Sequence, residues 1–353
     1  MVVKRRIDVA DALPTMGPIA PLVSVVVATY NRLDSLLWLL NDLRTQKPVD
    51  GDIEVVVVDD GSARSVEPEL AVRDYPFALR VLTQANGGPA AARHAGIEAS
   101  TGELIVIVDD DMVLPETFVV AHVEAHRNGS DVVMGHIRGP RDRSGLSLFE
   151  QFHQKSLDRF VAAYRLGTLR LDGGRLCTGN VSFPRSVYFE VGGFDQTLGR
   201  LEDRELGIRF EAAGLTLSFS EEAWNEHRSD HEDVTTWRRR SRLYGELDVV
   251  ISTQYPSVSH VSPWAFLPQL PKITWPFAAL AACAPAVGRS VAAAAYEVGE
   301  RLEQQGRTSV GLHGAAACYA LDYFSGVGTR LGSARAVISS IRSWRALRPP
   351  VLG

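Results

Sequence analysis

The chain has few cysteines and no long apolar run, and both deficits narrow the class of protein. Three cysteines stand among its 353 residues, at positions 177, 283 and 318. An odd number at such wide spacing predicts neither a disulfide framework nor a cysteine metal site, and it favours a reducing compartment. No window reaches the roughly 18 uninterrupted apolar residues that a membrane-spanning helix needs. The nearest, residues 273–287, contains Pro276 and Pro285, so we expect a buried or interfacial helix there.

The chain also lacks an excess of positive charge and a secretory leader. Its 37 Lys and Arg residues are outnumbered by 42 Asp and Glu, for a net charge of −5. We therefore expect no nucleic-acid partner. Asp8 and Asp11 interrupt the segment that follows the basic N-terminal residues, which argues against a signal peptide. These features predict a cytoplasmic protein, with peripheral contact at the inner face of the membrane as an alternative.

What the sequence does contain is a regular alternation of aliphatic runs and helical segments. The runs VSVVVAT (residues 23–29) and IEVVVVD (residues 53–59) are typical of parallel strands buried on both faces. Further strands are predicted in LRVLTQ, in ELIVIVD and over residues 132–137, with helices over residues 33–45, 66–74, 89–100 and 115–127. This order predicts an α/β fold: a Rossmann-like, mostly parallel sheet flanked by helices, with ligands at the carboxyl ends of the strands.

The alternation fades after about residue 140, and the remaining segments are mostly helical. Helices are predicted over residues 146–165 and 204–213, with LTLSF as a short strand after the second. Beyond residue 234 the chain is helical apart from a proline-rich stretch. We therefore divide it into an N-terminal extension (1–21), an α/β domain (22–254) and a helical C-terminal region (255–353).

Three adjacent carboxylates, Asp109, Asp110 and Asp111, follow one of the aliphatic strands. Like charges packed together raise one another's pKa unless a positive charge compensates for them. A hard divalent cation with oxygen ligands supplies such a charge, and it can also bind a diphosphate leaving group. The alternative is a solvated acidic turn before the next helix.

Two other strand ends carry polar signatures that can bind a nucleotide. Asp59-Asp60-Gly61-Ser62 is either a strand-to-helix turn or a place where a carboxylate accepts a hydrogen bond from a base or ribose. Asn86-Gly87-Gly88-Pro89 is either a plain helix start or an anion site at free backbone amides. Arg93, one turn into that helix, can face a diphosphate or the acidic cluster.

Five motifs together resemble the family 2 inverting glycosyltransferases, which share the GT-A fold. They are VSVVVATYNR, VVVDDGS, NGGPAAARHAGIEASTGELIVIVDDD, TGNVSFPRSVYFEVGGFD and LEDRELGIRFEAAG, in one order over roughly residues 22–245. Each is weak alone, and their order and spacing carry the resemblance. It implies transfer of a sugar from a nucleoside-diphosphate sugar, UDP- or dTDP-linked by family habit, with Mg²⁺ or Mn²⁺.

The resemblance also implies roles for individual residues. Thr29, Tyr30 and Asp60 would bracket the nucleobase, while Asp109 and Asp110 would hold ribose or sugar. Asp111, with Asp109, would bind the metal, and Asp203 of the Glu202-Asp203 pair would be the general base. The loop that ends at Asn180 would lie beneath the donor sugar. The donor-binding set is Thr29, Tyr30, Asn31, Asp60, Arg93, Asp109, Asp110, Asn180 and Glu202.

Three groups of residues can also be explained without a role in catalysis or binding. Without the family, Glu202 and Asp203 are simply acids favoured at a helix N-terminus. His227, which the resemblance makes a third metal ligand, is otherwise a surface loop histidine, and His231 is a weaker candidate. The arginines at positions 238, 239, 240 and 242 are first a solvated helix face, and second a contact for an anionic acceptor such as a lipid phosphate.

Two other functions remain open beside the transferase. A nucleotidyltransferase is disfavoured because the segment after the first strand, ATYNRLDS, lacks the glycine-rich loop of those enzymes. A non-catalytic nucleotide-sugar-binding protein is disfavoured because Asp60, Asp109, Asp111 and Asp203 are all present. The sequence does not select the acceptor, for which a lipid-linked molecule or a polysaccharide is considered.

Overall fold

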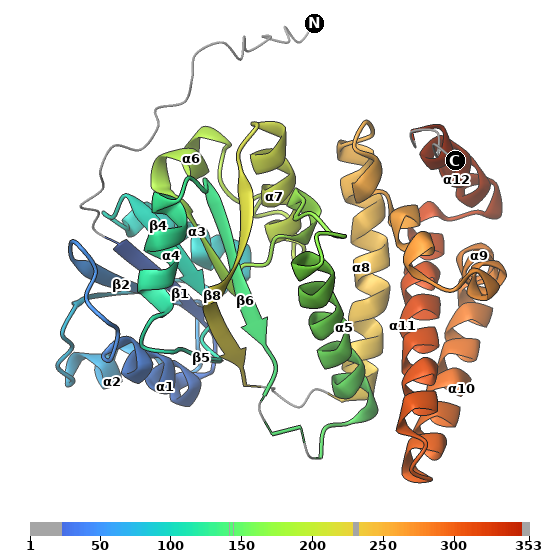
Figure 1. Ribbon diagram of the computed structural model, residues 1–353, viewed down its shortest axis with the longest axis horizontal. Helices are drawn as coiled ribbons and strands as arrows, with labels where there is room; N and C mark the ends of the chain where they lie inside the picture. The colour runs from blue at the N-terminus through green and yellow to red at the C-terminus, as the bar shows by residue number, and fades with distance from the viewer. Residues whose placement is uncertain (1–22, 141, 144, 229–232, 348–353) are drawn as a thin grey trace, which may run out of the picture.

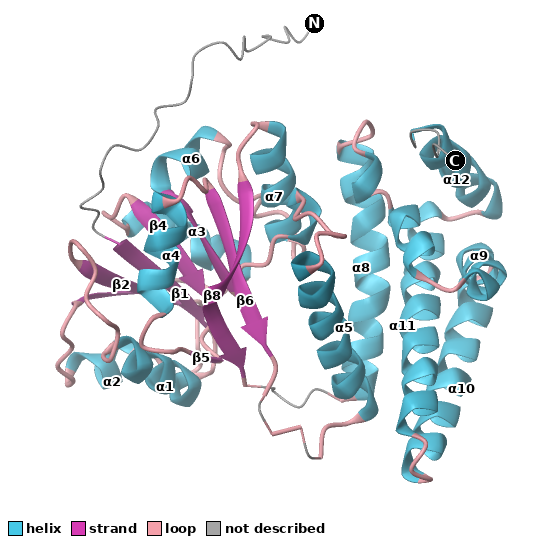
Figure 2. Ribbon diagram, in the orientation of Figure 1, coloured by secondary structure: helices cyan, strands magenta, loops and turns pink. Residues whose placement is uncertain are grey.

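A half built on a β-sheet and a half made of helices alone lie side by side (Figures 1 and 2). The computed structural model describes residues 23–140, 142–143, 145–228 and 233–347. The N-terminal extension and His231 lie outside the described residues. The division into 1–21, 22–254 and 255–353 stays a prediction.

The described strands form one sheet in the order β3-β2-β1-β4-β7-β6-β8-β5. They are β1 (Val23–Thr29), β2 (Ile53–Asp59), β3 (Ala78–Thr83), β4 (Leu104–Val108), β5 (Met112–Val113), β6 (Val132–Arg138), β7 (Asn180–Pro184) and β8 (Leu217–His227). The strands β1 to β4 are parallel to one another, as predicted. The other half is mixed, because β7 runs antiparallel to both β4 and β6. The α/β prediction is confirmed, and "mostly parallel" holds only for the β3-to-β4 half.

Seven helices belong to the sheet half. They are α1 (Leu33–Leu43), α2 (Glu67–Ala71), α3 (Pro89–Ala99), α4 (Phe118–Arg127), α5 (Leu148–Arg165), α6 (Arg185–Glu190) and α7 (Glu202–Ala212). The central strands bury aliphatic side chains on both faces, which explains their unbroken apolar sequence. Leu36, Leu39 and Phe118 pack on one face. Ile97 and Phe210 pack on the other. The predicted elements are found, although the helix expected over residues 66–74 is only one turn and a half.

The helical half begins with α8 (Val234–Gln254) and continues through α9 (Trp275–Cys283), α10 (Pro285–Gln304), α11 (Thr308–Leu331) and α12 (Ala334–Leu347). The helix expected over residues 273–287 is split at Ala284, because Pro285 opens a new helix. Helices α8 and α11 approach closely: a Cβ added at Gly245 would lie 2.0 Å from the Tyr323 carbonyl oxygen. Glycine is therefore required at that crossing.

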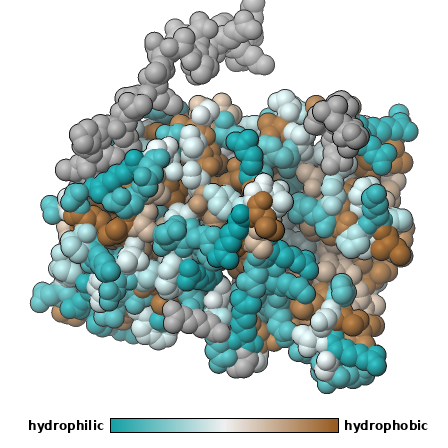
Figure 3. Space-filling view, in the orientation of Figure 1, coloured by the Kyte–Doolittle hydropathy of each residue, from teal (hydrophilic) through white to brown (hydrophobic). Residues whose placement is uncertain are grey.

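The surface of the helical half is rich in apolar side chains. In Figure 3 they gather at the right edge, over the C-terminal helices. The exposed members include Ile273, Phe277, Leu280, Val287, Val291 and Val298. Within the described part of the chain, no helix combines the length and the apolar character needed to span a bilayer. Peripheral membrane contact stays a prediction.

A buried acid joins α8 to α11. Asp322, fully buried on α11, accepts hydrogen bonds from Arg238 Nε at 2.7 Å and from Arg242 Nη1 at 3.0 Å. These two arginines, which the sequence suggested to be part of a solvated face, are instead partly buried and paired. Two of the four arginines of the basic run therefore attach α8 to α11.

We expect Asp322→Asn to lower the free energy of unfolding by about 3 kcal/mol, because it leaves two partly buried cations without their counter-charge. The matched control is Asp158→Asn, which breaks the exposed pair with Arg143 and should change stability by less than about 1 kcal/mol. Guanidinium titration of both variants gives the comparison. Equal effects would show that Asp322 does not hold the two helices together.

Candidate active site

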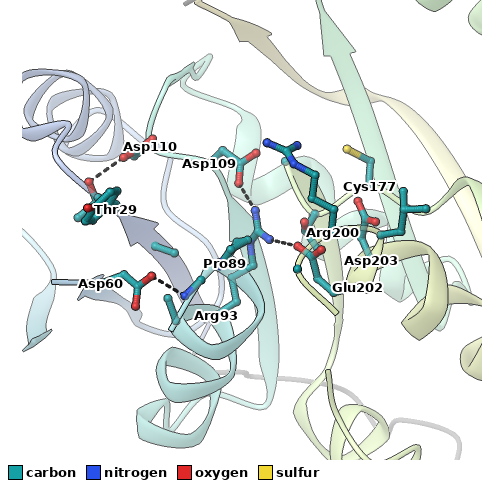
Figure 4. A pocket seen from close by; sticks show the side chains of 18 of the residues that line it. Thr29, Asp60, Pro89, Arg93, Asp109, Asp110, Cys177, Arg200, Glu202 and Asp203 are labelled. Carbon is teal, nitrogen blue, oxygen red and sulfur yellow. Dashed lines mark hydrogen bonds and ion pairs between the residues drawn. The ribbon is translucent and has the colours of Figure 1, made fainter. Parts of the chain in front are cut away.

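A cleft of about 670 Å³ opens at the carboxyl ends of β1, β2 and β4. Its lining includes Thr29, Tyr30, Asp60, Arg93, Asp109, Asp110, Glu202 and Asp203 from the predicted set. Figure 4 shows Thr29 and Asp60 on one side, Arg93 and Asp109 in the middle, and Glu202 with Asp203 on the other. The topology thus brings together side chains that lie far apart in the sequence, as the strand-end rule predicts.

Asp60 shapes one end of the cleft. Its two carboxylate oxygens accept hydrogen bonds from the backbone amides of Gly87 (2.8 Å) and Gly88 (2.9 Å), and one also accepts from Gln84 Nε2 at 2.7 Å. The neighbouring Asp59 accepts from the amide of Ser62. Asp59 closes the turn, as the plainer interpretation expects, whereas Asp60 lines the cleft and fixes the glycine loop. Contact between Asp60 and a nucleobase or ribose stays a prediction.

Thr29 and Arg32 hold the acidic cluster from the β1 side. Thr29 Oγ1 donates to Asp110 Oδ2 at 2.7 Å, and Arg32 Nη1 lies 3.3 Å from Asp110 Oδ1 and 2.7 Å from Asp111 Oδ2. Burial raises the pKa of Asp110 to about 6, although Thr29 and Arg32 act in the opposite direction. The bond from Thr29 fixes the orientation of Asp110 at the base of the cleft.

Arg93 connects the two sides of the cleft. Its Nη2 lies 2.7 Å from Asp109 Oδ1, and its Nη1 lies 2.7 Å from Glu202 Oε1. Burial lowers the pKa of the guanidinium, but Asp109 and Glu202 outweigh that effect and raise it above its usual range. Arg93 is therefore a permanent cation between two acids, and it faces the acidic cluster as one interpretation of the sequence expected.

Asp203 stands in the first turn of α7, which follows a residue in an unusual conformation. Leu201 has φ +64°, in the left-handed region that non-glycine residues rarely adopt. Asp203 Oδ1 accepts from the backbone amide of Arg204 at 2.8 Å. Burial, and secondarily the charge of Glu202, raise the pKa of Asp203 to about 6. A carboxylate with that pKa can take a proton at neutral pH.

Asp111 and His227 meet in a smaller pocket of about 290 Å³ next to the cleft, which shares Arg32 and Tyr244 with it. His227 Nε2 lies 3.4 Å from Asp111 Oδ2, and Asp111 Oδ1 is buried without a hydrogen-bond partner. An unpartnered buried carboxylate oxygen beside an imidazole fits a divalent cation. No set of three His, Cys, Asp or Glu residues able to hold a metal ion occurs in the described chain. These two residues would hold the ion only together with ligand oxygens or water.

Asp109, also expected as a metal ligand, pairs with Arg93 instead.

The geometry can now be compared with known proteins. Residues 24–187 match the model of the glycosyl transferase family 2. The protein contains a family 2 glycosyltransferase domain. The resemblance inferred from the five motifs is thereby confirmed.

Relatives of the glycosyltransferase domain carry a range of names. Validoxylamine A glucosyltransferase of Streptomyces hygroscopicus subsp. jinggangensis is 31% identical over 243 residues, which are 60% of this chain and 57% of that protein. The undecaprenyl-phosphate 4-deoxy-4-formamido-L-arabinose transferase of Pseudomonas fluorescens is 38% identical over 131 residues, 35% of this chain and 37% of that protein. The chain thus spans just over half the length of the first relative and about a third of the second.

A solved structure shares the fold over most of the chain. The mannosyltransferase of Pyrobaculum calidifontis, determined with GDP-Man and Mn²⁺, superposes with a TM-score of 0.56 and 21% identity over 85% of this chain and 87% of that one. At this level of identity the likeness shows the fold alone.

Two expected donor residues of the glycosyltransferase domain do not line the cleft. Asn31 accepts from the amide of Ala63 at 2.8 Å and so ties the end of β1 to the turn after β2. Asn180 is fully buried: its Nδ2 donates to the Ala223 carbonyl oxygen at 2.8 Å, and its Oδ1 lies 2.9 Å from His122 Nε2. Asn180 supports the loop before it, where Thr178 and Gly179 line the cleft.

Asn86, from the segment expected as a helix start or an anion site, lines the cleft. Other residues of the cleft were missed by the sequence interpretation. They are Arg32, Cys177, Arg200 and Tyr244. Arg32 directly follows the Thr29-Tyr30-Asn31 signature and could have been found there. Tyr244 is carried by α8, far along the chain, and no local pattern distinguishes it.

Beneath Asn180 two buried histidines share one serine. His122 Nδ1 and His126 Nε2 each lie 2.8 Å from Ser182 Oγ. Burial lowers the pKa of His122 to about 3 and that of His126 to about 4. Both rings are therefore neutral in the folded protein, whereas their ordinary pKa is about 6.5.

We expect acid to destabilise the glycosyltransferase domain through these histidines. A lowered folded-state pKa contributes stability above pH 6.5 that is lost as pH falls toward about 4 and 3. His126→Gln, which cannot take a proton, should flatten the decline in melting temperature between pH 7 and 4.5. His313→Gln, an exposed histidine on α11, is the control. A slope unchanged by His126→Gln would contradict this account.

Proposed function

We propose that the protein is an inverting glycosyltransferase that moves a sugar from a nucleoside-diphosphate sugar to an acceptor hydroxyl, assisted by Mg²⁺ or Mn²⁺. The single observation that carries the proposal is the cleft in which Asp60, Arg93, Asp109 and Asp203 converge. The family 2 match over residues 24–187 supports the reaction class.

The donor would lie along the cleft with its nucleoside near β1 and β2. Thr29, Tyr30 and Asp60 line that end, and the exposed Tyr30 ring offers a surface for a base. The sugar would then lie toward Glu202 and Asp203. UDP and dTDP donors stay favoured by family habit, whereas the Pyrobaculum calidifontis neighbour was solved with GDP-Man.

Asp203 is proposed as the general base. In an inverting displacement the acceptor oxygen forms a bond to the anomeric carbon while the bond to the diphosphate breaks. The hydroxyl proton goes to the Asp203 carboxylate. Arg93 pairs with Asp109 and with Glu202, whereas Asp203 is buried beside Glu202 and has its pKa raised to about 6.

Asp111 and His227 are the proposed metal ligands, since one oxygen of Asp111 is buried without a partner beside the imidazole. A bound Mg²⁺ or Mn²⁺ would neutralise the charge that develops on the departing diphosphate. Arg32, which contacts the other oxygen of Asp111, keeps that carboxylate oriented. Together these side chains lower its pKa despite its burial.

We expect Asp203→Asn to reduce kcat by about 10²- to 10⁴-fold, because the general base is lost. Wild-type activity should fall as pH drops below about 6, where Asp203 takes a proton. The same variant should be more stable than wild type at pH 8, by about 2 kcal/mol, because a raised pKa means that ionisation of Asp203 costs the folded state. Steady-state kinetics across pH and thermal melting test both effects.

The control for this variant is Asp50→Asn, an exposed acid outside the cleft, which should change neither quantity. Full activity of Asp203→Asn would exclude the assigned base.

We expect EDTA to abolish transfer and Mn²⁺ or Mg²⁺ to restore it. Asp111→Asn and His227→Gln should each raise the Mn²⁺ concentration for half-maximal activity by at least about tenfold, because each removes one of two protein ligands. Release of nucleoside diphosphate from a panel of nucleotide sugars gives the readout, with His313→Gln as control. Undiminished activity in excess EDTA would refute the metal role.

A further inference from the structure

An apolar pocket of about 310 Å³ lies between β6 and α5 and shares Cys177 with the active-site cleft. Its lining is Met134, Gly135, His136, Ile137, Ser156, Leu157, Phe160, Val161, Arg175, Cys177 and Phe219. We call it the Phe219 pocket. Its volume is at the lower end of the range of small-molecule sites, which run from about 300 to 1,000 Å³.

The walls of the Phe219 pocket are aromatic and aliphatic. The Phe160 ring meets Phe219 edge-on at 5.3 Å between centroids, and the His136 ring lies 5.8 Å from the same ring. Met134 and Val161 are buried beside them. The one cation in the lining, Arg175, is held by Asp172 at 3.1 Å. A polar or charged group placed against the aromatic and aliphatic part of these walls would lose hydration without gaining hydrogen-bond partners there.

The Phe219 pocket and the active-site cleft meet at Cys177, which lines both. Gly179 stands at the same boundary: a Cβ added there would lie 3.1 Å from Asp109 Oδ2 and 3.2 Å from Ile137 Cδ1. Figure 4 shows Cys177 beside Asp203. Burial, with Asp203 and Asp109 nearby, raises the pKa of the Cys177 thiol to about 12. The side chain at the boundary, Cys177, is thus small and uncharged, and it lies next to the proposed base Asp203.

We propose that the Phe219 pocket receives an apolar substituent, of the size of an aromatic ring, on the acceptor whose hydroxyl is positioned at Asp203. This inference rests on the proposed function and names the acceptor class for that same site. A hydroxyl at Asp203 places the group attached to it against whatever adjoins the base, and the neighbour on the Cys177 side is apolar. The donor nucleoside is assigned to the opposite end of the cleft, and the donor sugar to the space beside Glu202 and Asp203. The acceptor is therefore an aryl- or alkyl-bearing alcohol.

The test uses alcohols that differ only in their apolar group. Purified protein with Mn²⁺ and a panel of nucleoside-diphosphate sugars is assayed for nucleoside diphosphate release, first in water alone. Alcohols are then added in pairs, each made of one compound with a small apolar group and one with a phenyl group. The pairs are methyl and phenyl β-glucoside, the corresponding galactosides and mannosides, and ethanol and 2-phenylethanol. An alcohol bound at the acceptor site either receives the sugar, which increases the release of nucleoside diphosphate, or blocks donor hydrolysis by water, which decreases it. Binding therefore changes the measured release in either case.

We expect the phenyl member of at least one pair to act at about tenfold lower concentration than its partner, since burying a ring of that size favours binding by at least that factor. Ser156→Phe, which places a ring inside the pocket, should abolish this preference and leave donor hydrolysis in water unchanged. Ala162→Phe adds the same ring on the exposed side of α5 and should keep the preference. Leu157→Ala, which enlarges the pocket, should extend the preference for aromatic substituents to naphthyl glycosides.

Two negative results have different meanings. Donor hydrolysis without a phenyl preference in any pair, or a preference that survives Ser156→Phe in a folded protein, overturns the acceptor pocket alone. Absence of nucleoside diphosphate release from every donor, both in water and with every alcohol added, overturns the proposed function. Thermal melting of each variant establishes that it is folded.

Discussion

The buried guanidinium of Arg93 is the interaction on which the site depends. It reaches from α3 to Asp109 at the end of β4 and to Glu202 at the start of α7. Without a cation there, two carboxylates would be desolvated next to Asp203, and each would raise the pKa of the others. By pairing with both acids, Arg93 compensates the charge of Asp109 and Glu202 in a cleft where burial already raises the pKa of Asp110 and Asp203 to about 6. It also fixes the separation between the nucleotide side and the α7 side.

Much of the sheet could be predicted because parallel strands buried on both faces need unbroken aliphatic runs, and β1, β2 and β4 have them. The strand-end rule then placed Thr29, Asp60 and the Asp109–Asp111 cluster at one rim. In the far half, β6 and the first residues of β8 were expected, whereas β5, β7 and the rest of β8 were not. The long β8 is amphipathic and irregular, and the direction of β7 depends on long-range pairing. Asn180 shows the same limit, since only tertiary packing puts its amide onto His122 rather than into the cleft.

The role of Asp203 illustrates a different limit. Two acids at a helix N-terminus are ordinary, and the family resemblance alone singled out this pair. The structure adds physical detail in the form of burial, a raised pKa and a left-handed residue, Leu201, just before them. A strained backbone costs about 1 kcal/mol or more and persists where packing fixes it. Leu201 is packed against Ile208, Ile251 and Val261, so residues of the helical half and of the segment after α8 maintain this conformation.

The helical half also contacts the first turn of α7, which carries Asp203, through polar side chains. Arg204, the residue after Asp203, pairs with Asp248 of α8 at 2.7 Å, and Tyr323 of α11 donates a hydrogen bond to the other oxygen of Asp248 at 2.6 Å. The Arg204 Nε also donates to the Gly174 carbonyl oxygen. The first turn of α7 is thereby held from behind by α8 and α11 and from the cleft side by Arg93 through Glu202. A displacement of α11 would therefore be passed to Asp203 through the side chains of Asp248 and Arg204. The C-terminal helices thus help to orient the Asp203 carboxylate.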